Sequence, residues 1–310
     1  MSTDSCVIRN YCSADVDRYI RFHARAESVC RSEDTFLLAS LRGESLQPVE
    51  FSEEDLFMAE EKGEIVGSCR VVPEPAIDRA VLRLMIAPGF FGRAAEAELL
   101  RSALRRAADL KTTKVHADLR EEDSAARDLF ARLGFTPVRR YTDMALDLEP
   151  ASIGELKYEG LSKRSLEPGG EAEFARLQND AFAGSWGFCP NTTAEIVQQL
   201  NTPGYGHDGV IVAYYKETAV GYCWTAEVHR QNRESETKTG RIHMMGVAPE
   251  SRGRGFGKYI LWTGLKHLAG NGIRTVELTV DNENEAARSL YESTGFKRKT
   301  ALVWYEKHMR

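Results

Sequence analysis

One short stretch in the second half of the chain combines glycine and arginine in a pattern suited to binding a phosphate. It lies between an apolar run typical of a strand and a segment with helical periodicity. The first N–H groups of a helix lack intrahelical partners, and the helix dipole makes that end positive. Glycines leave such a backbone open to an anion, and arginines add mobile positive charge. The pattern therefore predicts a pyrophosphate site. Its residues are Arg252, Gly253, Arg254, Gly255, Phe256 and Gly257.

Three other interpretations of this glycine stretch have to be weighed. A disordered Arg-Gly tract would not lie between two well-patterned elements. A dinucleotide-binding loop has glycines spaced GxGxxG and an acidic residue about 20 positions later. Glu277 lies near that position, but the glycines here are spaced GxGxG and come late in their unit. A plain helix-entry loop that binds nothing stays open as an alternative.

The glycine stretch belongs to the second of two similar halves of the chain. Residues 115–135 match 276–296 at a constant interval of 161 positions, and 86–100 match 247–261 at the same interval. Matched pairs include Ala126 and Ala287, Arg127 and Arg288, Gly134 and Gly295, and Phe135 and Phe296. Agreement at one fixed interval over this distance indicates a tandem duplication.

The repeat length and the local patterns predict the domains and their fold. We expect an N-terminal domain over 1–150 and a C-terminal domain over 151–310, joined near a segment that contains proline and glycine.

The second half has predicted helices over 171–182, 191–200, 258–270 and 283–295. Its predicted strands are 209–216, 219–228, 241–247, 273–280 and a final pair over 296–300 and 301–307. A strand over 141–148 ends the first half, and residues 229–240 are expected to form a polar loop. The helix over 191–200 has Asn191 or Thr192 as its N-cap. This order predicts an α/β fold with a mixed sheet and helices on both faces.

The composition narrows the possible partners. The formal net charge of -5 argues against a nucleic-acid partner, which needs a basic surface. No apolar stretch is long enough to span a membrane, and the N-terminal residues lack the apolar core of a signal peptide. The 6 cysteines form no CxxC pair and the 7 histidines no HxxxH spacing, so no metal is expected. We therefore predict a soluble cytoplasmic protein with no metal, nucleic-acid or membrane partner.

Two motifs in the second half resemble those of the GCN5-related N-acetyltransferase (GNAT) superfamily. The pattern [Q/R]-x-x-G-x-[G/A] is complete as Arg252, Gly255 and Gly257. The pattern N-x-x-A-x-x-x-Y-x-x-x-G-F is complete as Asn284, Ala287, Tyr291, Gly295 and Phe296. The resemblance covers the second half and, in weaker form, the first. It implies two tandem acyl-CoA N-acyltransferase domains that use acetyl-CoA as cosubstrate.

The resemblance also implies which residues would hold the cosubstrate. The backbone of the glycine stretch, together with Lys258, would bind the CoA pyrophosphate. The backbone of Met245, Gly246 and Val247 would bind the thioester oxygen and the pantetheine arm, a polarising contact. Asn284 and Tyr291 are the remaining residues expected to contact the cosubstrate.

Acetyl transfer to an amine needs an acid for the departing thiolate and a base for the amine. The resemblance makes Tyr291 the acid, although its helix spacing also fits a plain core aromatic. Strand alternation predicts that Arg241, His243 and Met245 share one face. Many relatives carry a glutamate at the position of Arg241, and others carry a histidine at the position of His243. With an ordinary pKa of about 6.5, His243 is the predicted base, and the alternative is a structural histidine satisfied by hydrogen bonds. Glu227 is the second candidate.

Aromatic residues follow the first helix of the second half, where relatives recognise their acceptors. They are Phe182, Trp186 and Phe188. These side chains either line an acceptor pocket or cap the core.

The first half has lost the residues that carry this chemistry. At the 161-residue interval, the places of Arg252, Gly255, Gly257 and Tyr291 are taken by Phe91, Ala94, Glu96 and Phe130. Glu96 would bring negative charge to the pyrophosphate position, and Phe130 has no proton to donate. The first domain is therefore predicted to be degenerate, either a scaffold or part of the frame of the acceptor site.

The predicted function is acetyl transfer from acetyl-CoA to the primary amine of a small molecule, by direct attack in a ternary complex. The active site is expected in the C-terminal domain. The alternatives are a non-catalytic acyl-CoA-binding or regulatory protein and a protein N-acetyltransferase. A monomer or homodimer is expected.

Overall fold

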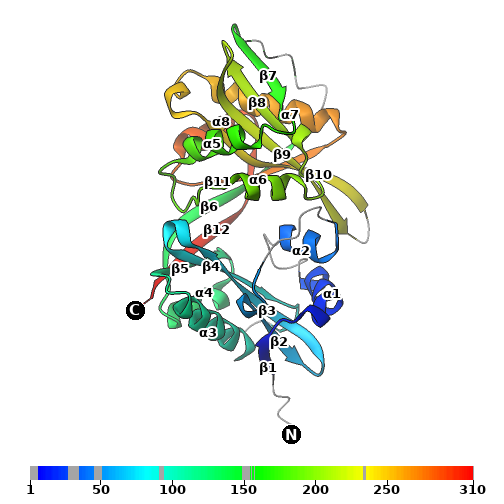
Figure 1. Cartoon of the computed structure of the whole chain (residues 1–310), viewed down its shortest axis with the longest axis vertical. Coiled ribbons are helices and arrows are strands. Elements are labelled where there is room, and N and C mark those ends of the chain that lie inside the picture. The colour runs from blue at the N-terminus through cyan, green and yellow to red at the C-terminus, as the bar shows by residue number, and fades with distance from the viewer. Residues whose placement is uncertain are drawn as a thin grey trace. The chain divides into compact units, whose positions relative to one another are not determined.

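A computed structural model describes residues 6–26, 35–44, 51–90, 94–148, 154, 156, 158–232 and 235–309 of the chain (Figure 1). The chain divides into two compact units. Unit 1 comprises Met1–Arg140 and Leu302–Arg310, and unit 2 comprises Tyr141–Ala301. Each unit has its own hydrophobic core.

Unit 2 is built on a mixed sheet with the strand order β6-β11-β10-β9-β8-β7. The strands are β6 (Thr136–Asp147), β7 (Leu161–Ser165), β8 (Val210–Tyr215), β9 (Thr218–Asn232), β10 (Ser235–Val247) and β11 (Thr275–Asp281). β10 and β11 run parallel, whereas the other neighbouring pairs run antiparallel. The mixed sheet predicted from the order of elements is confirmed.

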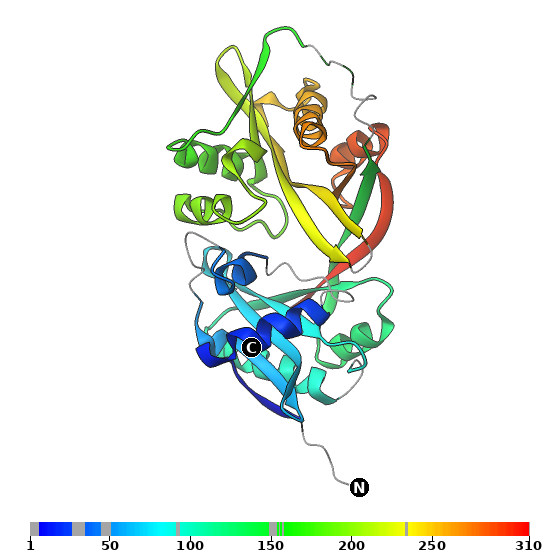
Figure 2. The same ribbon diagram turned by 90° about the vertical axis from the view of Figure 1, so that its right-hand side faces the viewer.

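Helices cover both faces of this sheet, as predicted. They are α5 (Glu171–Phe182), α6 (Thr193–Leu200), α7 (Phe256–Gly270) and α8 (Glu285–Ser293). Figure 2 shows the green α5 and α6 on one side of the sheet and the orange α7 and α8 on the other. Apolar residues at helical spacing on α7, such as Ile260, Leu261 and Leu265, are buried against the sheet. On the opposite face Phe174 of α5 meets Trp224 of β9 at 5.5 Å between ring centroids.

Unit 1 has a sheet with the order β1-β2-β3-β4-β5-β12. Its strands are β1 (Val7–Asn10), β2 (Leu56–Glu61), β3 (Glu64–Glu74), β4 (Arg79–Ile86), β5 (Lys114–Arg120) and β12 (Lys297–His308). Its helices are α1 (Val16–Ala26), α2 (Thr35–Leu41), α3 (Ala94–Asp109) and α4 (Ser124–Arg132). Buried residues of α3 and α4 form one core with the sheet, and those of α1 and α2 form another.

The duplication inferred from the sequence is visible in the elements themselves. β5 and β11, α4 and α8, and β6 and β12 begin and end at residues that are 161 positions apart. The helix caps also correspond. The side chain of Asp123 accepts a hydrogen bond from Ala126 N at 3.0 Å, and that of Asn284 accepts one from Ala287 N at 3.0 Å.

The last strand of each repeat passes from one unit into the other. β6 begins in unit 1, and its residues Tyr141–Asp147 pair with β11 in unit 2. β12 begins in unit 2, and Leu302–His308 pair with β5 in unit 1. The predicted final pair of strands over 296–307 is therefore wrong. The segment is one strand of 12 residues, because its pairing partner comes from the other repeat. The boundary between repeats at residue 150 lies outside the described residues and stays a prediction.

The segment predicted as a polar loop, 229–240, is also different in the structure. β9 continues to Asn232 and β10 begins at Ser235, so the segment forms the far end of a hairpin. Cross-strand pairing continues along both strands, from Val247 opposite Gly221 to Ser235 opposite Asn232. Polar composition does not reveal this pairing, because backbone hydrogen bonds join the two strands whatever their side chains are.

The predicted N-cap at 191–192 and the predicted strands over 209–216 and 219–228 are confirmed. Thr192 is the N-cap of α6, and Glu195 completes a capping box with it. β8 and β9 form the predicted hairpin, and its turn residues Lys216 and Glu217 have φ of 47° and 67°. No described helix is long and apolar enough to cross a membrane. Within the described residues, no cluster of three or more His, Cys, Asp or Glu side chains has a geometry that could hold a metal.

Candidate active site

The parallel strands β10 and β11 separate before β10 ends. Register pairs join them from Thr239 with Thr275 to Arg241 with Glu277. β10 then continues to Val247 while it stays paired with β9 on its other edge. Among the described residues, no register pair joins the last part of β10 to β11, and this unpaired edge between the two strands is called the opening below. Such an opening at the carboxyl ends of parallel strands is the usual place for a ligand in open sheets.

A β-bulge in β10 lies directly at this opening. Its register with β9 passes from Ile242 opposite Thr225 to Met244 opposite Trp224, which makes His243 an extra residue. Bulges redirect side chains and are common next to active sites. The bulge therefore sets where the side chain of His243 lies.

The bulge also decides which residues of β10 share a face. Arg241 bonds to Thr279 of β11 on the face covered by α5 and α6, and the ring of His243 lies 4.9 Å from that of Trp224 on the same face. Met245 instead packs against the core under α7. The prediction that Met245 shares the face of His243 is wrong, because one extra residue shifts the alternation of the strand.

The last residues of β10 present their backbone, rather than their side chains, to the opening. Met245 and Val247 direct their side chains into the core under α7. Gly246 lies against α5, where a Cβ would come within 2.7 Å of the Cβ of Ala181. This close approach explains the glycine and brings α5 onto the same part of the strand.

The glycine stretch joins β10 to α7, as predicted. Gly253 and Gly255 have φ of 73° and 81°, in the left-handed region that favours glycine. A Cβ at Gly253 would have no atom within 4 Å, and one at Gly255 would lie 3.9 Å from the Tyr158 hydroxyl. α7 begins after Gly255 without a side-chain cap, so the first N–H groups of the helix are available to a ligand. These features suit a pyrophosphate.

The two arginines of the stretch are held more firmly than predicted. The guanidinium of Arg252 donates hydrogen bonds to Val247 O at 3.2 Å and Ala181 O at 2.7 Å. Arg254 lies 4.6 Å from the ring centroids of both Tyr215 and Phe256. The description of both as mobile charges is therefore wrong. Arg252 ties the end of β10 to the end of α5, and Arg254 is stacked on aromatic rings. Lys258, in the first turn of α7, is exposed.

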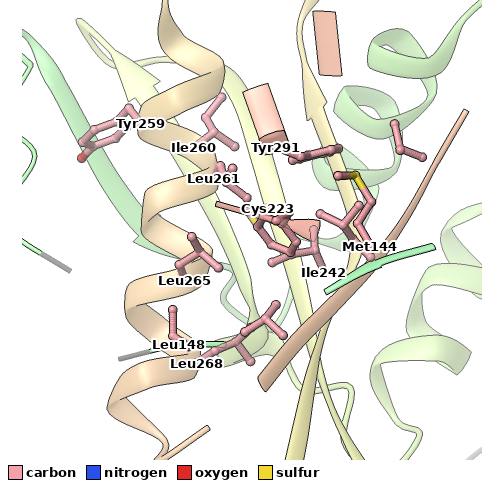
Figure 3. Close-up of a cluster of buried hydrophobic side chains, with 14 of the residues drawn as sticks. Met144, Leu148, Cys223, Ile242, Tyr259, Ile260, Leu261, Leu265, Leu268 and Tyr291 are labelled. Atoms are coloured by element: carbon pink, nitrogen blue, oxygen red, sulfur yellow. The ribbon is translucent and has the colours of Figure 1, made fainter. Parts of the chain in front are cut away.

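Tyr291 lies on α8 in the core beneath α7 and is only 7% exposed. Figure 3 shows its ring beside Cys223 of β9 and the inner face of α7. Burial, with a smaller contribution from Cys223, raises the pKa of Tyr291 well above its ordinary value of 10.0. The phenol therefore keeps its proton at neutral pH. Its packing fits the plain core aromatic foreseen as the alternative, and it leaves the acid role open as well.

Asn284 has a structural task in addition to any contact with a cosubstrate. Its side-chain oxygen caps α8, the helix that carries Tyr291. Asp123 performs the same task in unit 1. Because both repeats keep this cap, Asn284 serves at least to position Tyr291.

The two candidate bases lie on opposite faces of the sheet. The ring of His243 lies between Trp224 and Tyr205, 4.9 and 5.0 Å away, on the face of α5 and α6. Glu227 is directly opposite Gly240, whose Cβ position points at Leu268 of α7. Opposed residues share a face, so the side chain of Glu227 lies on the α7 side. The structure thus favours His243 for a substrate that approaches from the α5 and α6 side.

The aromatic residues at the end of α5 and directly after it lie on the face of the sheet that α5 and α6 cover. The rings of Phe182 and Phe188 are 5.2 Å apart. Trp186 lies 6.3 Å from Tyr141, a residue of β6. β6 belongs to the first repeat, so this face of unit 2 includes a residue that the repeat boundaries assign to the first half.

Sequence reasoning missed a chain of hydrogen bonds on the same face. Arg241 donates to the Thr279 hydroxyl at 3.1 Å, and Thr279 donates to a carboxylate oxygen of Asp143 at 2.6 Å. Thr300 donates to the other oxygen of Asp143 at 3.0 Å. No sequence signal joins these residues, since Asp143 and Thr279 meet only through the pairing of β6 with β11.

Unit 1 differs from unit 2 at three of these points. Phe130, the counterpart of Tyr291, is buried and packs on Phe135 with 4.8 Å between ring centroids. Glu96, the counterpart of Gly257, lies in the first turn of α3 and is 7% exposed. The register of β4 with β3 runs without a bulge. Phe91 lies outside the described residues.

Comparisons with known proteins agree with the repeat and the fold. The sequence profile of the acetyltransferase (GNAT) family matches residues 22–135 and again residues 172–296. A mycothiol acetyltransferase of Thermobispora bispora is 35% identical over 231 residues, which cover 72% of this chain and 75% of that protein. Another from Thermomonospora curvata is 28% identical and covers 91% of both chains.

Solved structures show the same fold. A GCN5-related N-acetyltransferase from Sphaerobacter thermophilus superimposes with a TM-score of 0.73 at 21% identity, over 98% of this chain and 96% of that one. A tandem GNAT protein from the clavulanic acid biosynthesis pathway also has a TM-score of 0.73, at 17% identity, over 98% of both chains. Two family matches in one chain, together with a duplicated mixed sheet, lead to one conclusion: the chain belongs to the acetyltransferase (GNAT) family and is an N-acetyltransferase built from two copies of the family's fold.

Proposed function

We propose that unit 2 transfers an acetyl group from acetyl-CoA to the primary amine of a small molecule, in a complex that holds both substrates. One observation carries the proposal. The opening between β10 and β11 has Tyr291 on the side of α7 and α8, and His243 on the side of α5 and α6. An acid on one face and a base on the other suit a reaction in which two substrates meet at the opening.

The residues around the opening fit acetyl-CoA as the donor. The uncapped start of α7 and the left-handed Gly253 and Gly255 offer N–H groups to the pyrophosphate. The backbone of β10 from Met245 to Val247 lies next in the chain, where it can bind the pantetheine arm. In this arrangement the thioester reaches the opening from the α7 side.

The positions of His243 and Tyr291 on opposite faces of the sheet assign the two proton transfers to these two residues. His243 accepts one proton from the ammonium form of the acceptor, and the free electron pair of the neutral nitrogen then attacks the acetyl carbon. N–H groups of β10 stabilise the negative charge that develops on the carbonyl oxygen. As the carbon–sulfur bond breaks, the sulfur keeps the electron pair and takes the proton of Tyr291, and the nitrogen gives up its second proton to the Tyr291 oxygen.

The choice of a small acceptor rests on the relatives. Proteins that match most of this chain carry the name mycothiol acetyltransferase, which refers to a small molecule rather than to a protein. One fold can serve many substrates, so the name of a relative does not fix the amine of this chain. The cytoplasmic location and the monomeric or dimeric state stay predictions from the sequence.

A turnover screen tests the proposal directly. The full chain is mixed with acetyl-CoA and a panel of small amines and peptides, and the release of free thiol is measured. We expect thiol release with at least one small amine, and calorimetry should find one acetyl-CoA bound per chain because unit 1 has Glu96 and Phe130 in place of Gly257 and Tyr291. Binding without turnover of any amine would support the regulatory alternative, and turnover of peptides only would support a protein N-acetyltransferase. Two bound acetyl-CoA molecules would contradict the degenerate unit 1.

The proposed base predicts a change in pH dependence. Substitution His243→Gln should lower kcat/KM by about 100-fold and remove the fall of the rate on the acidic side of its pH profile. Glu227→Gln changes a carboxylate on the opposite face of the sheet. It is the matched control and should leave the pH profile of the rate unchanged. An unaltered profile in His243→Gln, or a lost acidic limb in Glu227→Gln, would reverse the assignment.

A further inference from the structure

The segment 201–209, which joins α6 to β8, continues along the edge of β9 beyond the start of β8. The pairing of β8 with β9 reaches only to Trp224. Past that residue, Gly209 O accepts a hydrogen bond from the Thr225 hydroxyl at 2.9 Å. Further along, Gly204 O accepts one from Glu227 N at 2.9 Å. The segment is therefore bound to β9 at two places, directly after the strand residue that lies beside His243.

A tight turn in this segment sets the position of Tyr205. Residues 202–205 are threonine, proline, glycine and tyrosine, and Tyr205 N donates to Thr202 O at 2.9 Å. Gly204 has a φ of 84°. Proline in the second position and a glycine with positive φ in the third are typical of a type II turn. A Cβ at Gly204 would overlap Glu227 O, so glycine is also what lets the turn approach β9 this closely.

The turn packs the ring of Tyr205 against that of His243. Their centroids are 5.0 Å apart and the ring planes are at 87°. The ring of Trp224 lies 4.9 Å from that of His243, at 82°. Trp224 is fully buried and Tyr205 is 7% exposed, so both neighbours of the imidazole are themselves held by packing.

Edge-to-face packing of this kind limits how the imidazole can turn. Rings prefer perpendicular contacts at centroid distances of about 4.5–7 Å. The bond that turns an imidazole has broad energy minima, so the side chain's own rotamer does not fix where its nitrogens lie. A perpendicular ring in contact narrows that range, whatever the nitrogens bond to. The bulge sets where the side chain of His243 begins, and the neighbouring rings then limit its orientation.

Unit 1 lacks this arrangement. Its β4 pairs with β3 without a bulge, and Leu82 lies 161 positions before His243. Cys69 of β3 corresponds to Cys223 of β9 in the repeat, so the next residue, Arg70, takes the place of Trp224. The unit that keeps the glycine stretch is thus the one that packs an imidazole between two rings.

We propose that Tyr205 is a positioning residue for His243, whose ring holds the imidazole in the orientation that accepts a proton from the acceptor amine. A base has to lie within hydrogen-bond reach of the proton that it takes, so a small rotation of the imidazole is costly. The turn at Gly204 and the hydroxyl of Thr225 hold Tyr205 in place. The inference rests on the proposed function, in which His243 is the base, and adds a residue that acts through it.

Substitutions at Tyr205 test this role in the full-length protein, with acetyl-CoA and the small amine of the panel that is turned over fastest. Tyr205→Leu should lower kcat by about 10-fold or more and leave the affinity for acetyl-CoA unchanged. Tyr205→Phe keeps the ring and should keep kcat near that of the wild type. The matched control is Tyr214→Leu on β8, where the lost ring instead contacts the guanidinium of Arg164 at 4.8 Å. It should keep the wild-type kcat.

A double-mutant cycle separates positioning from a general structural effect. Once His243→Gln has removed the base, adding Tyr205→Leu should change kcat by less than about 2-fold, because no imidazole is left to orient. Thermal melting identifies variants that have lost their fold. If Tyr205→Leu is one of them, Tyr205→Met replaces it, since methionine fills the space with a flexible chain.

The outcomes distinguish this inference from the proposed function. An equal loss of kcat with and without His243, an equal loss in Tyr205→Phe, or a wild-type kcat in Tyr205→Leu would each overturn the role of Tyr205 and leave His243 as the base. Full activity of His243→Gln would instead overturn the proposed base, and the inference with it.

Discussion

Replacing Tyr291 with phenylalanine is expected to lower kcat for acetyl transfer by about 100-fold or more, while the affinity for acetyl-CoA stays nearly unchanged. The substitution removes one hydroxyl and keeps the ring. Its effect should therefore fall on the breaking of the carbon–sulfur bond, where the departing sulfur needs a proton. Single-turnover measurements of thiol release, set beside equilibrium binding of acetyl-CoA, separate the two effects.

The burial of Tyr291 makes this prediction specific in its pH dependence. Loss of solvation disfavours the ionised phenolate, which raises the pKa of Tyr291 above 10.0. The hydroxyl therefore keeps its proton throughout the neutral and mildly alkaline range. In the wild-type protein, ionisation of this group should cause no fall in rate below about pH 10.

The chain offers two controls for the Tyr291 substitution. Phe130 occupies the equivalent place in unit 1 and is fully buried, which shows that this fold accepts phenylalanine there. Tyr259→Phe removes a hydroxyl from another buried tyrosine, on α7 beside Tyr158. We expect full activity for Tyr259→Phe. Full activity for Tyr291→Phe would make Tyr291 a core residue only.

Replacing Gly257 with glutamate is expected to weaken acetyl-CoA binding by about 100-fold or more, because it puts a negative charge where the pyrophosphate should lie. Gly257 is the second residue of α7, within the turn whose N–H groups are open. Unit 1 already carries the corresponding residue, Glu96, in the first turn of α3. Isothermal titration with acetyl-CoA measures the change.

The fold should survive the Gly257→Glu substitution. A Cβ at Gly257 would lie 3.5 Å from Leu290 and 3.8 Å from Val247, which are ordinary contact distances. A carboxylate in the first turn of a helix is also favourable for the helix dipole, so the melting temperature should not fall. Gly257→Ala adds the Cβ without the charge and should bind acetyl-CoA almost as well as the wild type. Equal loss of affinity in both variants would attribute the effect to bulk, and no loss in either would remove this loop from the cosubstrate site.

Much of the fold and part of the site could be predicted because they depend on local patterns. Helical periodicity predicted α5 and α7, and strand patterns over 209–216 and 219–228 predicted β8 and β9. The repeat was readable because both copies keep the same interval, down to the caps Asp123 and Asn284. The backbone conformation at Gly253 and Gly255 could be predicted as well, because glycine is the residue that left-handed backbone favours.

By itself, then, the sequence determined the duplication, the family and most elements of the second repeat, and it predicted where a pyrophosphate should bind, since these depend on residue type and short spacing. Only the tertiary structure decided which residues share a face of the sheet. The bulge at His243 moved Met245 to the other side, and the register of β9 with β10 put Glu227 opposite Gly240. The tertiary structure alone also brought Asp143 to Thr279 and Arg241, through the passage of β6 into unit 2. Strand pairing joins residues far apart in the chain, and a shift of one residue reverses every side chain after it, so neither can be deduced from local sequence.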